Sequence, residues 1–263
     1  MNINTKIKAI PILFFDKKIN MNIYDYNQYT NDYDEGKDII SLCFERDLCW
    51  EPYQSELAKE ILECGGHVCI DVGSHLGTYS IISSIYGNRT IAIDRNKNVN
   101  NIFRKTIREN SLLRVNVLDL NITKDTNLKT ITRDKRIRLL KVDVGGTENE
   151  VYSVFKSKFE SKQIDYAMFE ISTKYAEKYK FVEDLHKMGY RIFDIGLSPQ
   201  RKLQTDTEHL HSEEFAAREI KGDFDRAIEN LSQGQSNFLF KSDKIVNEKC
   251  KCGVNMNYFK KTE

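Results

Sequence analysis

The chain has no excess of charge of either sign, and it lacks a hydrophobic run long enough to cross a bilayer. Its 40 Lys and Arg residues nearly balance 39 Asp and Glu residues, for a formal net charge of +1. A protein that binds nucleic acid mainly through phosphates needs a basic face, so we expect no nucleic-acid partner. The apolar run at residues 9–15 is too short for a membrane span, and no small-residue cleavage site follows it. We therefore expect a cytoplasmic protein.

The six cysteines do not have the spacing of a zinc site. Cys250 and Cys252 are separated by one residue, without the C-x-x-C spacing and second pair that would make a zinc site convincing. The other four are predicted to be small buried side chains rather than disulfides: Cys43, Cys49, Cys64 and Cys69. A catalytic divalent metal has no support in the sequence, and the oligomeric state cannot be predicted.

The length and the 40% hydrophobic content are sufficient for one α/β domain with extensions. We place this domain at residues 51–245, with an insertion at 197–236 before the last strand. Residues 1–50 are predicted to form an accessory segment with a hairpin over residues 10–24, and residues 246–263 a tail. Four tyrosines between positions 24 and 33 form either a wall for a sugar ring or a solvated loop: Tyr24, Tyr26, Tyr29 and Tyr33.

The most informative segment is a buried strand at 68–72 that ends in an acid and a glycine turn. Gly73 and Gly77 allow the backbone to pass close to a ligand. Dinucleotide enzymes place a pyrophosphate at such a turn, where Asp71 would repel it. An acid before the turn instead suits a cationic nucleoside without phosphate, such as S-adenosylmethionine. The predicted cofactor-binding residues of the turn are Asp71, Gly73, Ser74, His75 and Gly77.

Two further strands also end in acids. Asp94 closes the strand at 90–94, where an acid can accept hydrogen bonds from both ribose hydroxyls of a nucleoside. Asp119 follows the run at 115–118, where adenosine-binding methyltransferases often bind the adenine amino group. An acid at a strand end can also be a turn former or a helix cap. Both residues are predicted to bind the cofactor.

The strand at 138–144 carries two charges that point to the same face, Lys141 and Asp143. Charges in a buried strand are costly unless they are paired or used in function; the structural alternative is a Lys–Asp pair that starts the next helix. Glu170 stands near the end of the following strand. Ligands of open α/β sheets bind beyond the carboxyl ends of the strands, so Asp71, Asp94, Asp143 and Glu170 should share one edge.

In this order and spacing, five segments resemble the FkbM family of S-adenosylmethionine-dependent methyltransferases: residues 50–53, 70–77, 140–148, 169–170 and 237–240. The resemblance covers roughly residues 50–195 and the last strand. It implies an α/β, Rossmann-like class I methyltransferase fold with a mostly parallel seven-stranded sheet. To this fold the residue patterns of the chain add an N-terminal hairpin extension and a helical insertion before the last strand. Gly145 stands where the family usually has glutamate, and Arg95 where it often has proline.

The resemblance implies O-methylation of a hydroxyl on a sugar or a polyketide, and we expect a sugar in a glycan or glycosylated metabolite as the acceptor. Removing the hydroxyl proton requires a base within hydrogen-bond reach. Asp143 and Glu170 are predicted to flank that hydroxyl, one as base or metal ligand, with Lys141 tuning them; His75 is a rival base.

Two other functions stay open. Lys141, Asp143 and Glu170 would form part of the Lys-Asp-Lys-Glu tetrad of an RNA ribose 2'-O-methyltransferase, although the second lysine is missing. A noncatalytic adenosine-binding scaffold would explain Gly145. In the insertion, His209 and His211 are either bases or metal ligands, or belong to a helix surface.

Overall fold

The computed structural model describes residues 6–25, 38–134, 136–172, 174, 179–195, 218–222, 224–229 and 235–245. Within these residues, eight strands form one sheet in the order β5-β4-β3-β6-β7-β10-β8-β9. Their bounds are β3 (Val68–Val72), β4 (Arg89–Asp94), β5 (Val115–Asp119), β6 (Ile137–Val142), β7 (Ile164–Ser172), β8 (Tyr190–Asp194), β9 (Arg218–Ile220) and β10 (Gln235–Ser242). Strands β3 to β7 pair in parallel, whereas β10 runs antiparallel between β7 and β8. This confirms the prediction of a mostly parallel α/β sheet.

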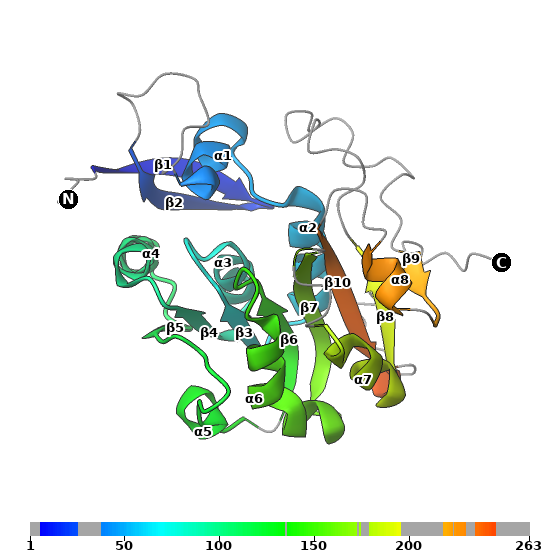
Figure 1. Cartoon of the computed structure of the whole chain (residues 1–263). Helices are drawn as coiled ribbons and strands as arrows, with labels where there is room; N and C mark the ends of the chain where they lie inside the picture. Colours follow the sequence, from blue (N-terminus) through cyan, green and yellow to red (C-terminus); the bar gives the residue numbers. More distant parts are fainter. Residues whose placement is uncertain are drawn as a thin grey trace.

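Helices cover both faces of the sheet (Figure 1). Their bounds are α1 (Ile39–Asp47), α2 (Pro52–Leu62), α3 (Thr78–Ile85), α4 (Lys97–Glu109), α5 (Leu128–Ile131), α6 (Glu148–Glu160), α7 (Phe181–Lys187) and α8 (Phe224–Glu229). Helices α2, α3 and α4 pack on one face, and α5, α6, α7 and α8 contribute to the core on the other. Helix α4 packs on the sheet through one apolar face. Its buried residues Val99, Ile102, Phe103 and Thr106 recur at helical spacing, and the rest of the helix is mostly polar.

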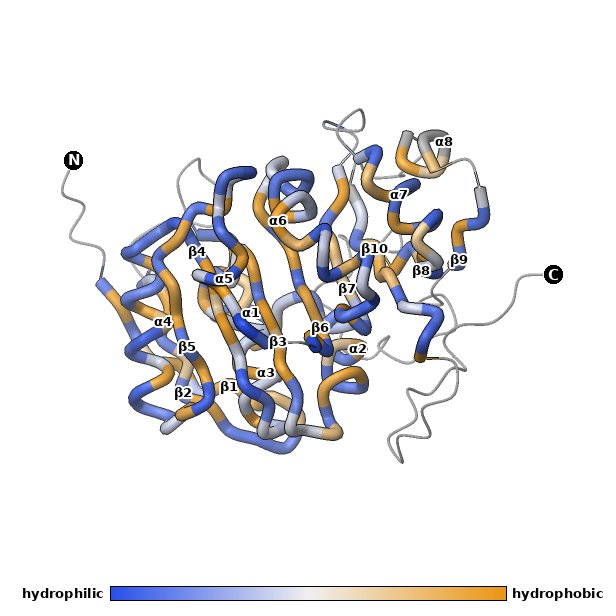
Figure 2. The backbone as a smooth tube through the Cα atoms, turned by 90° about the horizontal axis from the view of Figure 1, so that it is seen from below, coloured by the Kyte–Doolittle hydropathy of each residue, from blue (hydrophilic) through white to orange (hydrophobic). Residues whose placement is uncertain are grey.

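Successive residues of the central strands belong to different cores. In β6, Leu139 packs on the side of α2 and α3, and Leu140 packs on the side of α6. Every residue of β6 is buried, as expected for a parallel strand with helices on both faces. Figure 2 shows the hydrophobic residues along β3 and β6 at the centre of the sheet. Because side chains alternate across the sheet, every second residue of a central strand faces α2, α3 and α4, and the residues between them face the opposite core.

The predicted N-terminal hairpin is present. Strands β1 (Ile7–Phe14) and β2 (Lys17–Tyr24) pair antiparallel, with Ile12 opposite Ile19. Met21 and Ile23 are fully buried and join the core that contains α2, α3 and α4. The hairpin thus adds a layer outside those helices (Figure 1). Tyr24 packs against the same core, while Tyr26, Tyr29 and Tyr33 lie outside the described residues.

The sheet has one strand more than predicted, because part of the insertion is extended. Residues 218–220 form β9, which pairs antiparallel with the edge of β8, and the described helix of the insertion, α8, is short. The Arg191 guanidinium donates to both carboxylate oxygens of Glu219, at 2.7 and 3.1 Å, which fastens β9 to β8. His209, His211 and the tail at 246–263 lie outside the described residues.

The cysteine prediction is wrong at one position. Cys43, Cys49 and Cys69 are free thiols, two of them buried, whereas Cys64 is disulfide-bonded. Among the described residues no group of three or more His, Cys, Asp or Glu side chains could hold a metal ion, and no helix there is long and apolar enough to cross a membrane.

Candidate functional site

The turn after β3 is built on glycines that bring the backbone very close to its neighbours. Gly73 has φ +78°, and a Cβ there would lie 1.7 Å from the carbonyl oxygen of Asp143. Gly77 has φ +87°, and a Cβ there would lie 2.1 Å from the ring of Phe103, which is fully buried. Packing within the protein therefore requires glycine at both positions, whether or not a ligand also approaches the turn.

A cavity of about 300 Å³ opens at the carboxyl ends of β3, β4 and β6, where the sequence predicted a ligand. We refer to it as the carboxyl-edge cavity. Its lining includes His75, Asp94, Arg95, Asp143 and Gly145 together with apolar side chains. The volume lies at the lower end of the range of ligand pockets. Three predicted cofactor residues, Gly73, His75 and Asp94, thus meet one predicted catalytic residue, Asp143, in a single cavity.

Asp94 is held by backbone donors at the edge of this cavity. Its Oδ2 accepts a hydrogen bond from the His75 backbone N–H at 3.0 Å, and its Oδ1 accepts one from the Asn96 N–H at 2.7 Å. A carboxylate has about four acceptor sites, so each oxygen can accept a further bond. The contact with His75 also connects the turn after β3 to the end of β4, which fixes the carboxylate in the cavity wall.

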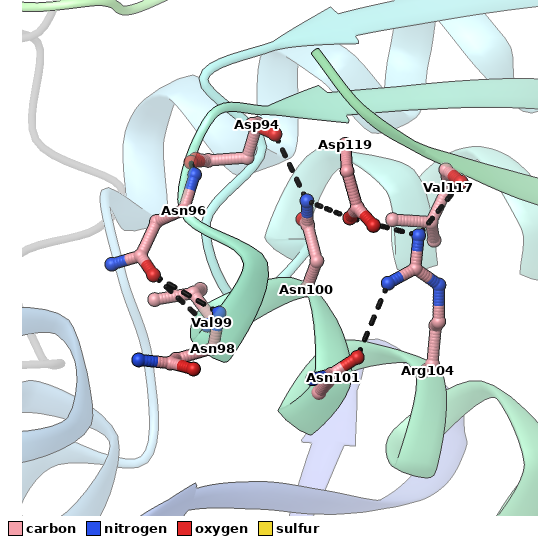
Figure 3. A network of polar contacts seen from close by, with 9 residues as sticks. All are labelled: Asp94, Asn96, Asn98, Val99, Asn100, Asn101, Arg104, Val117 and Asp119. Atoms are coloured by element: carbon pink, nitrogen blue, oxygen red, sulfur yellow. Dashed lines mark hydrogen bonds and ion pairs between the residues drawn. The ribbon is translucent and has the colours of Figure 1, made fainter. Parts of the chain in front are cut away.

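Asp119 is engaged elsewhere (Figure 3). Its Oδ1 accepts from Asn100 Nδ2 at 2.7 Å and from Arg104 Nη2 at 2.9 Å, and the bond from Arg104 lowers the pKa of this carboxyl. Arg104 also donates to the Val117 carbonyl at 3.1 Å, which ties α4 to β5. Asp119 is absent from the described lining of the carboxyl-edge cavity. The structure gives it a pairing role with α4.

Two polar atoms of the turn are buried without a partner in the described part of the chain, Ser74 Oγ and His75 Nδ1. Ser74 is only 6% exposed. The other ring nitrogen of His75, Nε2, lies 2.9 Å from Asp38 Oδ1 at the start of α1, and Ile40 of that helix lines the cavity. A buried hydroxyl without a partner is costly, so these atoms suit a ligand that supplies hydrogen bonds.

Asp71 lies deeper than the sequence suggested. It is 1% exposed, and its Oδ2 accepts from the Ser80 backbone N–H at 3.1 Å and the Ser80 hydroxyl at 2.7 Å. Burial raises the pKa of this carboxyl to about 6, against the opposing effect of the Ser80 hydrogen bond. Asp71 therefore anchors the first turn of α3 against β3, directly behind the glycine turn.

The strand register brings the predicted catalytic residues together. Lys141 lies opposite Asp71 on β3 and opposite Met168 on β7, so Asp143, two residues on, comes beside Glu170. Across the other edge of β7, Glu170 lies opposite Asn237. With Glu51, which precedes α2, and Tyr79 of α3, these side chains form what we call the polar cluster: Glu51, Tyr79, Lys141, Asp143, Glu170 and Asn237.

Lys141 stands at the centre of the polar cluster and is 1% exposed. Its Nζ lies 3.3 Å from Asn237 Oδ1 and 3.6 Å from Asp143 Oδ2, above the ring of Tyr79. The second face of the cluster is formed by Glu51, whose carboxylate accepts from the Tyr79 hydroxyl at 2.6 Å and from Asn237 Nδ2 at 3.0 Å. Carboxylates around Lys141 raise its pKa against the effect of burial, so it stays charged.

The surroundings of Glu170 favour its protonated form. Burial raises its pKa from 4.5 to about 8, and the charge of Asp143 and a hydrogen bond with it act in the same direction. Two carboxyl groups in contact cannot both ionise readily. Glu170 therefore holds a proton beside the Asp143 carboxylate, which is partly exposed and lines the carboxyl-edge cavity.

We predict that this proton is visible in the pH dependence of stability. Because the folded pKa of Glu170 is raised, its stabilising contribution is complete below pH 4.5 and is lost as the pH rises through about 8. Denaturant unfolding should show wild type losing stability across this window relative to Glu170→Gln. The control Glu183→Gln removes an exposed carboxylate that is paired with Lys187 and has a lowered pKa, so it should keep the wild-type pH dependence between pH 4.5 and 8. Equal pH dependence of wild type and Glu170→Gln would contradict the assignment.

Sequence reasoning gave no site role to Glu51, Tyr79, Asn237 or Asp38. Glu51 has φ +45° and is 8% exposed, a conformation rare for a side chain of this kind. Asn237 begins an otherwise apolar stretch of the last strand. A buried polar residue in an apolar strand was the available signal, but its partners, more than 90 residues away, could not be deduced.

Gly145 and Glu148 show how the loop after β6 is held. Glu148 is 1% exposed; its Oε1 accepts from the Gly146 N–H at 2.9 Å and its Oε2 from the Tyr179 hydroxyl at 3.4 Å. Gly145 has φ +64°, and a Cβ there would meet no atom within 4 Å. The loop is thus fixed without a side chain at position 145, which leaves that side of the cavity open.

Comparisons with known proteins identify the fold. No protein-family model and no curated protein sequence matches the chain. A structure from Clostridium thermocellum described as a "putative rRNA-methylase" is similar with a TM-score of 0.50 and 9% identity, over 72% of this chain and 92% of that chain. The O-methyltransferase from Bacillus cereus, solved with S-adenosylhomocysteine, has a TM-score of 0.47 and 14% identity, over 81% and 94%. Together with the strand order, the first similarity shows a Rossmann-like class I methyltransferase fold.

Proposed function

We propose that the chain is an S-adenosylmethionine-dependent O-methyltransferase of the FkbM type that acts on a sugar hydroxyl. The observation that carries the proposal is the position of Asp143. It belongs to the polar cluster, beside a protonated Glu170, and it also lines the carboxyl-edge cavity at the ends of the parallel strands. Asp143 is therefore both the proposed base and part of the wall of the proposed cofactor cavity.

The residues around the carboxyl-edge cavity fit the cofactor. His75 lines the cavity and its unpartnered Nδ1 can bond to a polar ligand, and Asp94 has acceptor sites left for ribose hydroxyls. Ser74, whose hydroxyl is also unpartnered, belongs to the same turn but lies outside the described lining. Gly145 leaves space where a side chain would stand. S-adenosylmethionine, when bound, supplies an electrophilic methyl group. Gly73 shapes the turn by its close backbone approach to Asp143, and the Asp71 carboxylate holds the first turn of α3 behind it.

In this proposal Asp143 takes the proton of the acceptor hydroxyl. Glu170, protonated, donates a hydrogen bond to Asp143 and keeps it oriented, while the Lys141 ammonium at 3.6 Å stabilises its negative charge. Glu51 and Asn237 position Lys141 from the other side. Orientation of this kind contributes to rate because it removes the need to order the groups during reaction. His75, paired with Asp38, is directed toward α1.

The choice of a sugar acceptor is supported by the charge balance of the chain and by the members of the polar cluster. Besides Lys141, the groups in the cluster are carboxyls, a phenol and an amide. Within the described residues no second lysine completes the tetrad of an RNA 2'-O-methyltransferase. A neutral polyol presents hydroxyls and no phosphate to such a site.

We predict that calorimetry will detect binding of S-adenosylmethionine and of S-adenosylhomocysteine, but not of NAD. Asp94→Ala should abolish both bindings, because the variant removes the carboxylate predicted to accept the ribose hydroxyls and the contacts that hold it to the turn. Asp125→Ala, at an exposed turn carboxylate, is the matched control and should bind normally.

The outcome separates the functions under consideration. Binding lost in Asp94→Ala alone would establish the cofactor and justify screening glycan acceptors for formation of S-adenosylhomocysteine. Absence of binding in the wild type would overturn the proposal. Binding without turnover on any hydroxyl acceptor would favour the noncatalytic adenosine-binding scaffold.

A further inference from the structure

A second cavity lies on the hairpin side of the molecule, away from the site described above. Its volume is about 330 Å³, and it is enclosed by β1 and its turn, the end of α1, and α2. We call it the hairpin cavity. It shares no described lining residue with the carboxyl-edge cavity. The function proposed above therefore makes no use of it.

Aromatic rings form much of its wall: Phe14, Phe15, Phe44, Trp50 and Tyr53. Phe14 and Phe44 lie in contact with their ring centroids 6.3 Å apart, and both are buried. Aromatic and aliphatic walls of this kind offer few hydrogen bonds to water, so such a cavity is better filled by apolar groups. The lining thus predicts an apolar ligand moiety.

The rim of the hairpin cavity is apolar and accessible. Leu13 of β1 is 69% exposed and Leu48 at the end of α1 is 53% exposed, and both line the cavity. Single exposed leucines are common on protein surfaces, but these two belong to the lining of one hollow. A chain that enters past them can bury its methylene groups against the aromatic wall.

The charges in the lining restrict the ligand further. Two carboxylates, Glu56 and Glu60, line the hairpin cavity, and its described lining contains no cationic side chain. Lys59, which pairs with Glu56 at 2.7 Å, lies over the ring of Phe15 and is not part of the lining. Glu56, Glu60 and Lys59 together carry one net negative charge, which disfavours a fatty-acid carboxylate here relative to an uncharged head group.

We propose that the hairpin cavity is a binding site for a neutral molecule with a short single alkyl chain. The site is separate from the carboxyl-edge cavity, but it adjoins the polar cluster at residues 50–52. Trp50 and Pro52 line the hairpin cavity, whereas Glu51 between them is hydrogen-bonded into the polar cluster. A ligand bound in the hairpin cavity therefore contacts Trp50 and Pro52, the neighbours of Glu51, without competing with the cofactor for its site.

The chain reports on this site directly, because Trp50 is its only tryptophan. Titration with 1-decanol, below its solubility limit, should give a saturable change in tryptophan emission. Decanoate, with the same chain length and a negative charge, should bind about tenfold more weakly or worse. Saturating S-adenosylhomocysteine should leave the decanol affinity unchanged. Equal affinity for both amphiphiles, no saturable change, or competition by S-adenosylhomocysteine would each overturn the proposal.

A pair of surface variants locates the binding. Leu13→Asp places a charge at the rim of the hairpin cavity and should weaken decanol binding about fivefold or more, through lost apolar contact. Leu113→Asp, at a leucine that is 90% exposed and outside the described lining, should bind as wild type does. Thermal unfolding of both variants checks that they fold. Identical affinities of the two folded variants would place the decanol elsewhere and refute the assignment.

Discussion

Asp143→Asn should bind S-adenosylmethionine as wild type does and turn over a hydroxyl acceptor about 100- to 10,000-fold more slowly, the usual effect of losing a general base. The carboxylate lines the cavity and lies beside Glu170, whose raised pKa keeps it protonated and unable to take the proton itself at neutral pH. Asparagine preserves the shape of the side chain and removes its basicity. Rates of S-adenosylhomocysteine formation, compared with calorimetric affinity, measure the two effects separately.

Asp125→Asn is the control for this variant, since it makes the same chemical change at an exposed turn. Its turnover should equal that of wild type. If Asp143→Asn keeps full turnover while the cofactor binds, Asp143 is not the base. The proposed mechanism would then be wrong at its central residue.

Gly73→Ala should be the most destabilising single-methyl change in the site. The added Cβ would lie 1.7 Å from the carbonyl oxygen of Asp143, and φ is +78°, so both backbone strain and a collision with backbone oppose it. The left-handed conformation alone costs about 1–2 kcal/mol for a residue with a Cβ. The clash must add to this cost, because the turn or the end of β6 has to move. The midpoint of thermal unfolding should fall accordingly, by about 2–4 °C for each kcal/mol.

Gly145→Ala provides a matched comparison. Its φ is +64°, but an added Cβ would meet no atom within 4 Å, so only the conformational cost applies. Its unfolding midpoint should fall by much less than that of Gly73→Ala. Equal losses in the two variants would show that the turn relaxes away from Asp143, and the close approach would not constrain the fold.

The acids at strand ends illustrate what local pattern could and could not predict. The sequence predicted Asp71, Asp94, Asp143 and Glu170 at the carboxyl edge, because parallel strands end on one side. In the structure Asp94 and Asp143 line the cavity there, with Glu170 beside Asp143. Asp71 and Asp119 end strands too, yet one is buried against Ser80 and the other is paired with Arg104. Strand position is a property of the local sequence, whereas the direction a carboxylate faces depends on the helix packed beside it.

The extra strand and the polar cluster show the same division. Residues 218–220 become a strand because the edge of β8 is available to pair, which no pattern within that segment indicates. Glu51 and Asn237 lie 186 residues apart in sequence and share a hydrogen bond. Contacts of this separation depend on the order of strands in the sheet, and the β7-β10-β8 arrangement brings the last strand into the site.

The sequence by itself determined the succession of strands and helices, the glycine turn and the hairpin, since hydrophobic period and turn residues act over a few neighbouring positions. Only the tertiary structure decided which side chains form the polar cluster and which line a cavity. Lys141 meets Asn237, and Asp143 meets Glu170, through strand register and the alternation of side chains across the sheet. The physical reason is that burial and pairing are set jointly by segments far apart in the chain, and a carboxyl acquires its pKa only in that environment.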